Sequence, residues 1–255
     1  MNLLEARGIS KSFAGIKALD AVSIEVAAGE RVGLIGPNGA GKTTLFNCML
    51  GVLDLDAGSV VFDGQDLAGL RVHQRALRGI GRTFQRIELF GEMTVRGHLL
   101  VAERVRVGLG GIWQDITGRG RPTAEEIRRC DEVLDLLGLG DLADEPIEAL
   151  SLGTGRLVEV GRALMTDPQL LLLDEPSSGL DRDETAALAA TLRTIQADQG
   201  FAILLVEHDV ELVSSFTQRT VVLDFGCVIA SGSTADVLAD PVVRTAYLGD
   251  LEGVE

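Results

Sequence analysis

The segment that most restricts the fold of this chain is Gly36-Pro-Asn-Gly-Ala-Gly-Lys-Thr, residues 36–43. An apolar run at residues 32–35 precedes it, and a second run at 44–50 follows it with helix-forming residues. A strand, a glycine-rich turn and a helix in this order are the context that a phosphate-binding loop requires. The sequence therefore predicts a P-loop, and with it a nucleotide-binding protein.

Each part of this loop has a physical reason. The glycines allow backbone conformations in which successive N–H groups point at a polyphosphate, and the following helix adds the positive end of its dipole. Lys42 is expected to reach the β- and γ-phosphates, Thr43 to bind Mg²⁺, and Thr44 to donate to the α-phosphate. The predicted loop residues are Gly36, Pro37, Asn38, Gly39, Ala40, Gly41, Lys42, Thr43 and Thr44.

Composition limits the remaining possibilities. The chain has 255 residues, of which 46% are hydrophobic, and its net charge is −15. This acidity argues against general affinity for nucleic acid or an anionic membrane. The sequence shows neither a spanning apolar run nor a signal-like start, and its three cysteines form no C-x-x-C pair. We expect a soluble protein in a reducing cytoplasm, without a zinc site or disulfides.

The fold class predicted from the apolar pattern is α/β. The runs 170–173 and 201–206 are continuously apolar, which is typical of strands covered by helices on both faces of a mostly parallel sheet. Residues 3–26 alternate and predict an antiparallel β region, and 86–165 predict an inserted all-helical lobe. The expected division is 1–85 for the β region and P-loop part of the core, 86–165 for the lobe, and 166–255 for the second core part.

Acidic residues and a histidine follow the two apolar strands. Because ligands collect beyond the carboxyl ends of parallel strands, Asp174, Glu175 and His208 are expected beside the P-loop. Asp174 is the predicted Mg²⁺ carboxylate, Glu175 the acceptor of a proton from attacking water, and His208 a donor to the γ-phosphate. Each alone can also be a charged residue at a strand end, but all three with a P-loop favour phosphoryl transfer.

The sequence leaves the roles of two further residues, Phe13 and Gln85, open. Phe13, two positions before a glycine, can stack on adenine or fill a core or edge position. Gln85 follows a short extended segment, where its amide can touch a metal, a water or a partner, although an ordinary surface residue is the simpler reading. The single tryptophan, Trp113, lies in a glycine-rich segment that cannot hold a helix.

From about residue 3 to 249 the chain resembles the ATP-binding subunit of an ABC transporter. The resemblance rests on the P-loop, on Gln85 as a glutamine loop, and on a signature-like Leu150-Ser-Leu-Gly-Thr154. It also includes a Walker B strand at 170–175, a D-loop at 178–181 that ends in Asp181, and His208 as a switch histidine. Two positions depart from the family signature, because Leu152 replaces a glycine and Thr154 a glutamine.

This resemblance implies a P-loop ATPase that uses ATP and Mg²⁺ and works as a dimer with a second ABC ATPase subunit. The P-loop of one subunit would face Ser151, Gly153 and Thr154 of the other across the nucleotide. The resemblance also implies Phe13 at the adenine, and Gln85 with Thr43 and Asp174 at the metal. The implied partners are integral membrane permease subunits, and nucleic acid is not an implied partner. The implied location is cytoplasmic, peripheral on the inner face of the cell membrane.

A narrower likeness points to one subfamily. Arg82-Thr-Phe-Gln85, the glycine-rich segment around Trp113, Glu207-His-Asp209 and Ala246-Tyr-Leu-Gly249 are similar to the ATPases of branched-chain and other hydrophobic amino-acid importers. Related ATPases for urea uptake or lipopolysaccharide export are alternatives. A soluble ABC ATPase acting on DNA or ribosomes is a third possibility, but coiled-coil insertions and a second cassette are absent from this sequence. A nucleotide kinase or switch would lack the signature helix.

Overall fold

The computed structural model describes residues 2–83, 89–107 and 122–248. Two features singled out from the sequence, Gln85 and the segment around Trp113, lie outside these ranges. The final Gly249 also lies outside them.

A six-stranded sheet forms the centre of the fold, in the strand order β10-β9-β3-β8-β7-β6. Neighbouring strands from β9 to β6 are parallel, and β10 pairs with β9 in the antiparallel direction. Their bounds are β3 Arg31–Ile35, β6 Ile80–Arg82, β7 Leu170–Asp174, β8 Ala202–Val206, β9 Arg219–Asp224 and β10 Cys227–Ser233. The predicted mostly parallel α/β sheet is confirmed.

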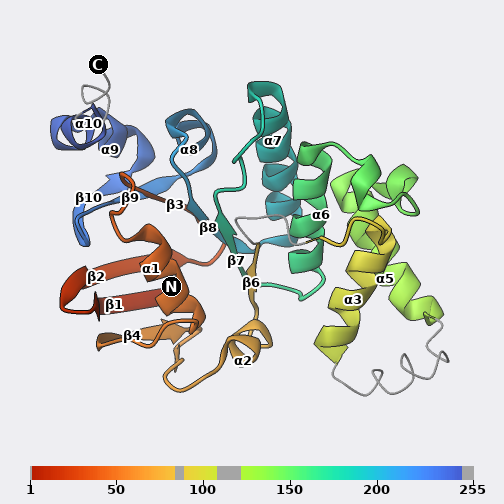
Figure 1. Cartoon of the computed structure of the whole chain (residues 1–255), viewed down its shortest axis with the longest axis horizontal. Helices are drawn as coiled ribbons and strands as arrows, with labels where there is room; N and C mark the ends of the chain where they lie inside the picture. The colour runs from red at the N-terminus through yellow and green to blue at the C-terminus, as the bar shows by residue number, and fades with distance from the viewer. Residues whose placement is uncertain (1, 84–88, 108–121, 249–255) are drawn as a thin grey trace.

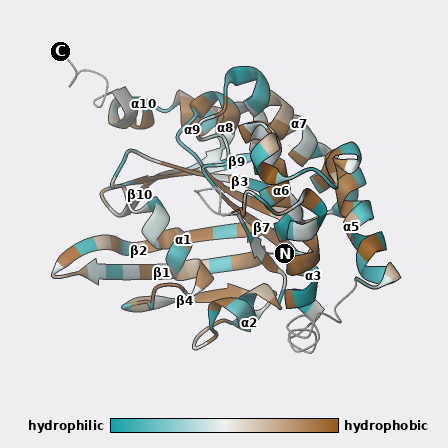
Figure 2. Ribbon diagram, turned by 45° about the vertical axis from the view of Figure 1, so that its right-hand side comes forward, coloured by the Kyte–Doolittle hydropathy of each residue, from teal (hydrophilic) through white to brown (hydrophobic). Residues whose placement is uncertain are grey.

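Alternate side chains of the central strands enter two different cores. Leu170 and Leu172 of β7 pack into a core on one face, whereas Leu171 and Leu173 pack into the core on the other face. All five residues of β7 are buried, as are all five of β8. In Figure 2 the strands of this sheet are mostly brown, which reflects the same apolar character. Burial on both faces explains why these segments show no alternation in the sequence.

An antiparallel sheet and helix α1 cover the first face. The sheet has the order β2-β1-β4-β5, and α1 shares its core with residues of β1 and β2. In Figure 1 this part is drawn in red and orange beside β3. The elements are β1 Asn2–Phe13, β2 Ile16–Ala27, α1 Lys42–Leu50, β4 Ala57–Phe62, β5 Gln65–Asp66 and the short α2 Val72–Ala76.

Helices cover the second face. Figure 1 shows α6 and α7 beside the sheet, with α3 and α5 farther out. These helices share one core with Leu171 and Leu173 of β7. The elements are α3 Val95–Val107, α5 Ala124–Leu137, the 3₁₀ turns η2 Gly140–Leu142 and η3 Ile147–Ala149, α6 Leu152–Leu164 and α7 Arg182–Gln199.

Three short helices complete the described chain. They are α8 Val210–Phe216, α9 Thr234–Ala239 and α10 Pro241–Leu248. The antiparallel pair of β9 and β10 directly precedes α9 and α10. Among the residues described, we find no helix with the length and apolar character needed to cross a membrane.

Candidate functional site

The P-loop lies between β3 and α1 and is shaped by two crowded glycines. Gly36 has a φ of 154°, and a Cβ on it would lie 2.1 Å from the carbonyl oxygen of Leu223. Gly41, the N-cap residue of α1, has a φ of 103°, and its Cβ would lie 2.6 Å from the carbonyl oxygen of Ala18. Both positions therefore require glycine for space as well as for conformation.

Lys42 begins α1 and is almost fully buried, with 6% of its surface exposed. Its ammonium donates to the carbonyl oxygens of Gly36 at 2.6 Å and Pro37 at 3.1 Å. Burial lowers the pKa of Lys42, while the charges of Glu175 and Asp174 act in the opposite direction. The lysine is thus electrostatically linked to the acidic residues that follow β7.

Thr43 and Phe13 are both accessible from solvent. Thr43 is exposed in the first turn of α1, where its hydroxyl can reach a ligand of the loop. Phe13 ends β1 and is 45% exposed, with the ammonium of Lys11 5.7 Å from the centre of its ring. Such exposure does not fit a core phenylalanine, so adenine stacking and an edge position remain as the two alternatives.

Asp174 is the last residue of β7 and is 9% exposed. Burial, together with the neighbouring charge of Glu175, raises the pKa of Asp174 to about 6. Two acids in this low-dielectric position favour a bound cation. A carboxylate and the hydroxyl of Thr43 are hard oxygen donors of the kind that Mg²⁺ uses alongside phosphate and water. These residues therefore fit a Mg²⁺ ion bound with a nucleotide.

Glu175 follows β7 in a left-handed conformation, with a φ of 46° that is uncommon for a residue with a side chain. Its amide donates to the carbonyl oxygen of Val206 at 2.9 Å, which ties it to the end of β8. Its Oε1 lies 4.0 Å from Nδ1 of His208. The structure thus brings these two predicted residues together, from loops that are 33 positions apart in the chain (208 − 175).

The signature-like segment begins α6. Ser151 is the N-cap residue, and its hydroxyl accepts a hydrogen bond from the amide of Thr154 at 3.2 Å. This cap allows the helix, Leu152–Leu164, to begin directly after Ser151. Leu152 is 42% exposed and lies against Gly179 of the D-loop. A Cβ added to Gly179 would lie 2.9 Å from Cδ2 of Leu152.

Asp181 is the N-cap residue of α7. Its carboxylate accepts from the amide of Glu184 at 2.8 Å, and the side chain of Glu184 accepts from the amide of Asp181 at 3.2 Å. This reciprocal capping box fixes the start of the helix. The residue predicted for the D-loop therefore has a structural task within its own chain.

Glu207 is a residue for which the sequence predicts no role. Glu207 follows β8 directly and its side chain is completely buried. The signal was present in the sequence, because an acid at the end of a fully apolar strand must find several hydrogen-bond donors if it is buried. Glu207 also contributes to the raised pKa of Asp174.

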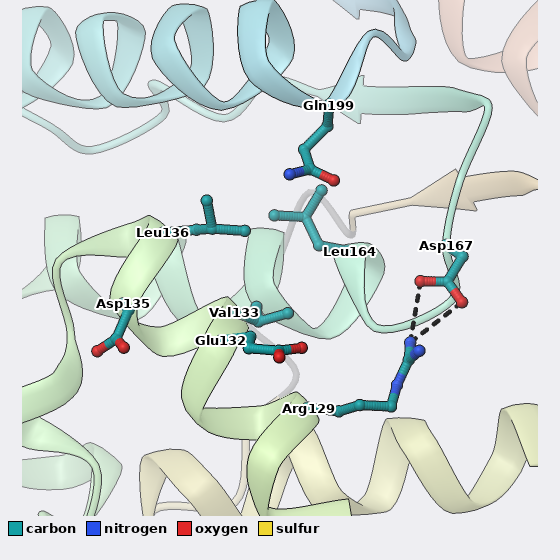
Figure 3. A pocket seen from close by; sticks show the side chains of 8 residues that line it. All are labelled: Arg129, Glu132, Val133, Asp135, Leu136, Leu164, Asp167 and Gln199. Carbon is teal, nitrogen blue, oxygen red and sulfur yellow. Dashed lines mark hydrogen bonds and ion pairs between the residues drawn. The ribbon is translucent and has the colours of Figure 1, made fainter. Parts of the chain in front are cut away.

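A separate groove of about 580 Å³ lies at α5 and at the ends of α6 and α7. Figure 3 shows Arg129 directed at the carboxylate of Asp167, with which it forms hydrogen bonds of 2.9 and 3.1 Å. None of the predicted site residues lines this groove. It is not the nucleotide site.

Comparison with known proteins agrees with this geometry. A family model described as "ABC transporter" matches residues 19–178, and a model described as "Branched-chain amino acid ATP-binding cassette transporter" matches residues 227–252. The chain is 36% identical to the high-affinity branched-chain amino acid transport ATP-binding protein BraF of Pseudomonas aeruginosa. The alignment covers 97% of this chain and 98% of BraF.

Two other curated relatives are similar over nearly the whole chain. LivG of Escherichia coli, another high-affinity branched-chain amino acid transport ATP-binding protein, is 37% identical over 97% of this chain and 98% of its own. The lipopolysaccharide export system ATP-binding protein LptB of Haemophilus influenzae is 33% identical over 98% of each. Both a branched-chain amino acid system and an export system are therefore represented among the relatives.

Solved structures show the same fold. The ADP conformation of an ATP-binding cassette of an ABC transporter superposes with a TM-score of 0.87 at 35% identity, over 98% of this chain and 99% of that one. A nucleotide-free ATP-binding cassette from an ABC transporter gives a TM-score of 0.85 at 32% identity, over 97% and 99%.

Proposed function

Since the chain belongs to the ABC transporter family as an ATP-binding, ATP-hydrolysing cassette, we propose that it powers the uptake of branched-chain or other hydrophobic amino acids through a membrane permease. One observation carries the chemical part of this proposal. The P-loop, Asp174, Glu175 and His208 occupy one edge of the sheet, where β3, β7 and β8 end.

The proposed hydrolytic roles follow from this arrangement. Lys42 and the loop amides would hold the phosphates, and Thr43 and Asp174 would hold a Mg²⁺ ion, which would supply positive charge to neutralise them. Glu175 accepts the proton of the attacking water, and His208 donates to the γ-phosphate. The Glu175 Oε1 and His208 Nδ1 atoms lie 4.0 Å apart. Phe13 offers an exposed ring for the adenine.

A second cassette is proposed to complete each pocket. Ser151 and Gly153 stand at the N-terminus of the 13-residue helix α6, where the backbone amides of the first turn and the helix dipole favour an anion. In the head-to-tail arrangement implied for the family, this helix start meets the γ-phosphate bound by the partner. Thr154 shares that position, and Asp181 lies at the D-loop beside it.

The permease is proposed to dock in a groove between the P-loop part of the core and the helices that follow it. This groove, of about 240 Å³, is lined largely by apolar residues of α1, α2, β6, α3 and α6. On its α3 side, Val101 is 47% exposed and Val105 68% exposed. Arg82 at the end of β6 also lines it, three positions before Gln85. This docking would hold the chain at the inner face of the membrane.

The substrate proposal rests on the relatives named for branched-chain amino acid transport and on the matching family model at residues 227–252. Export of a lipopolysaccharide-type lipid is the second candidate, because LptB is similar over almost the whole chain. The two functions differ in direction and in cargo, so a transport assay separates them.

The experiment is purification of the full chain with its permease, reconstitution into vesicles, and measurement of ATP-dependent leucine, isoleucine and valine accumulation. Lys42→Ala should abolish accumulation, and Val101→Arg should release the chain from the permease while its nucleotide affinity stays within about twofold of wild type. ATP-dependent extraction of lipopolysaccharide without amino-acid uptake would support the export alternative and exclude the import one.

A further inference from the structure

The acid that follows β8 is unusual because no part of the Glu207 side chain reaches solvent. A buried carboxylate is tolerated only when several donors replace its hydration. Glu207 cannot touch a nucleotide from this position. Any effect on hydrolysis must therefore pass through the groups that bind it.

One carboxylate oxygen of Glu207 binds the loop after β7. Its Oε1 accepts from the amide of Ser177 at 3.0 Å and from the hydroxyl of Ser177 at 2.7 Å. Ser177 is 7% exposed and lies two positions after Glu175. A double hydrogen bond to a charged group is among the stronger contacts available to a loop.

The other oxygen binds the loop after β8. Its Oε2 accepts from the amide of His208 at 3.1 Å and, more weakly, from the amide of Asp209 at 3.4 Å. Asp209 is itself fixed as the N-cap residue of α8. The carboxylate therefore stands between two loops and holds the backbone of each.

We infer that Glu207 is a positioning residue that sets the distance between Glu175 and His208 by joining the loops on which they lie. The inference rests on the hydrolytic roles proposed above for these two residues. Their side chains approach to 4.0 Å, and the only covalent path between them runs through α7 and β8. A displacement of about 1 Å at such a pair can lower turnover strongly.

Glu207→Gln is the first test. An amide has one oxygen and one NH₂ group, so it can accept from one loop but presents hydrogens to the N–H groups of the other. At saturating MgATP we expect turnover of the full chain to fall at least about tenfold, with KM for ATP within about twofold. Amide hydrogen exchange should become faster in residues 175–181 or 207–211, on whichever side the NH₂ faces.

Ser177→Ala is a milder variant, which tests the same contact if Glu207→Gln does not fold. It removes the 2.7 Å bond and leaves the 3.0 Å bond in place. Turnover should fall about two- to fivefold, and amide exchange should become faster in 207–211, on the loop that does not carry the substitution. A purely local role for the hydroxyl would leave that second loop unchanged.

Glu211→Gln is the matched control. It makes the same chemical change four positions along the chain, at a side chain that is 71% exposed on α8. Turnover and amide exchange should stay at the wild-type level.

The proposal requires two results. Glu207→Gln must lose turnover at nearly constant KM for ATP, and Ser177→Ala must show faster amide exchange in residues 207–211. It is overturned if either is absent, or if KM for ATP rises more than about tenfold together with the loss of turnover. The exchange measurement needs no hydrolysis, so it remains informative even if the proposed role of Glu175 proves wrong.

Discussion

Glu175 Oε1 and His208 Nδ1 lie 4.0 Å apart at the ends of two adjacent parallel strands, β7 and β8. The two residues are 33 positions apart in the sequence, and the backbone amide of each makes a hydrogen bond. The amide of Glu175 is bonded to Val206, and the amide of His208 to Glu207. The candidate water-activating carboxylate and the candidate phosphate contact thus lie on the loops that directly follow two neighbouring strands, and the backbone of each loop is held close to the strand ends.

The geometry of the P-loop predicts that alanine substitution at two of its glycines lowers the free energy of unfolding by different amounts. Gly36→Ala should destabilise the chain by ~3 kcal/mol or more, because the new Cβ would lie 2.1 Å from the carbonyl oxygen of Leu223. Gly39→Ala has open space around it and only the cost of a φ of 80°, about 1–2 kcal/mol. Urea unfolding of both variants measures the difference. Equal losses would show that the contact with Leu223 does not constrain the loop.

The N-terminus of α6 gives a second prediction. Ser151→Arg should abolish turnover by filling the position where a partner's phosphate is proposed to bind, while the chain stays folded. Ser151→Ala removes only the cap bond to Thr154 and should cost about 1 kcal/mol of stability. Steady-state ATPase rates and thermal unfolding separate the two effects. Wild-type turnover in Ser151→Arg would rule out use of this helix start.

Thr154 tests how much the departure from the family signature matters. Because its side chain lies on the exposed first turn of α6 and its hydroxyl contacts Ser151 at 3.1 Å, Thr154→Gln leaves the cap residue in place. We expect the hydrolysis rate to change less than tenfold, under about 1.4 kcal/mol. A larger change in kcat at saturating MgATP would mean that the residue contacts the nucleotide strongly.

His98 on α3 predicts a pH-dependent stability. It is 2% exposed, Nε2 accepts from the amide of Phe90 at 3.0 Å, and Nδ1 lies 3.0 Å from the carbonyl oxygen of Thr94. Burial lowers the pKa of His98, and Arg162 adds to this, while the bond to Thr94 opposes it. Neutral His98 therefore stabilises the fold above about pH 6.5, and this contribution is lost as the pH falls through the lowered pKa.

The corresponding measurement is urea unfolding at about pH 7.5 and 5.5. Wild type should lose more unfolding free energy on acidification than His98→Gln, whose amide can donate and accept in the same place without titrating. His73→Gln is the control, because His73 is exposed on α2. If wild type and His98→Gln respond alike to pH, the buried histidine is not the cause.

The sheet and the P-loop were predictable because their determinants are local. Continuous apolar runs identified β7 and β8, and the glycine spacing identified the turn before α1. No bounds were predicted for helix α7, although Asp181 and Glu184 form a recognisable capping box. The role inferred for Glu207 could not be predicted, because it depends on Ser177, 30 positions away, and hence on the order of the strands.

The phenylalanine at position 13 shows a different limit. Periodicity could not decide between a buried and an exposed ring, since the end of a strand continues neither face reliably. The structure shows an exposed ring. Stacking of this ring on adenine stays a prediction. Phe13→Ala tests it, because the substitution should weaken the affinity for ATP and leave the affinity for inorganic triphosphate unchanged.

The measurement that tests the account most directly is ATP turnover and equilibrium nucleotide binding of Glu175→Gln in the full chain, with Glu211→Gln as the exposed control. The account predicts that turnover at saturating MgATP falls by at least about one hundredfold, because the amide cannot accept the proton of the attacking water, while the Kd for ATP stays within about twofold. Turnover of Glu175→Gln equal to that of wild type would contradict the central claim.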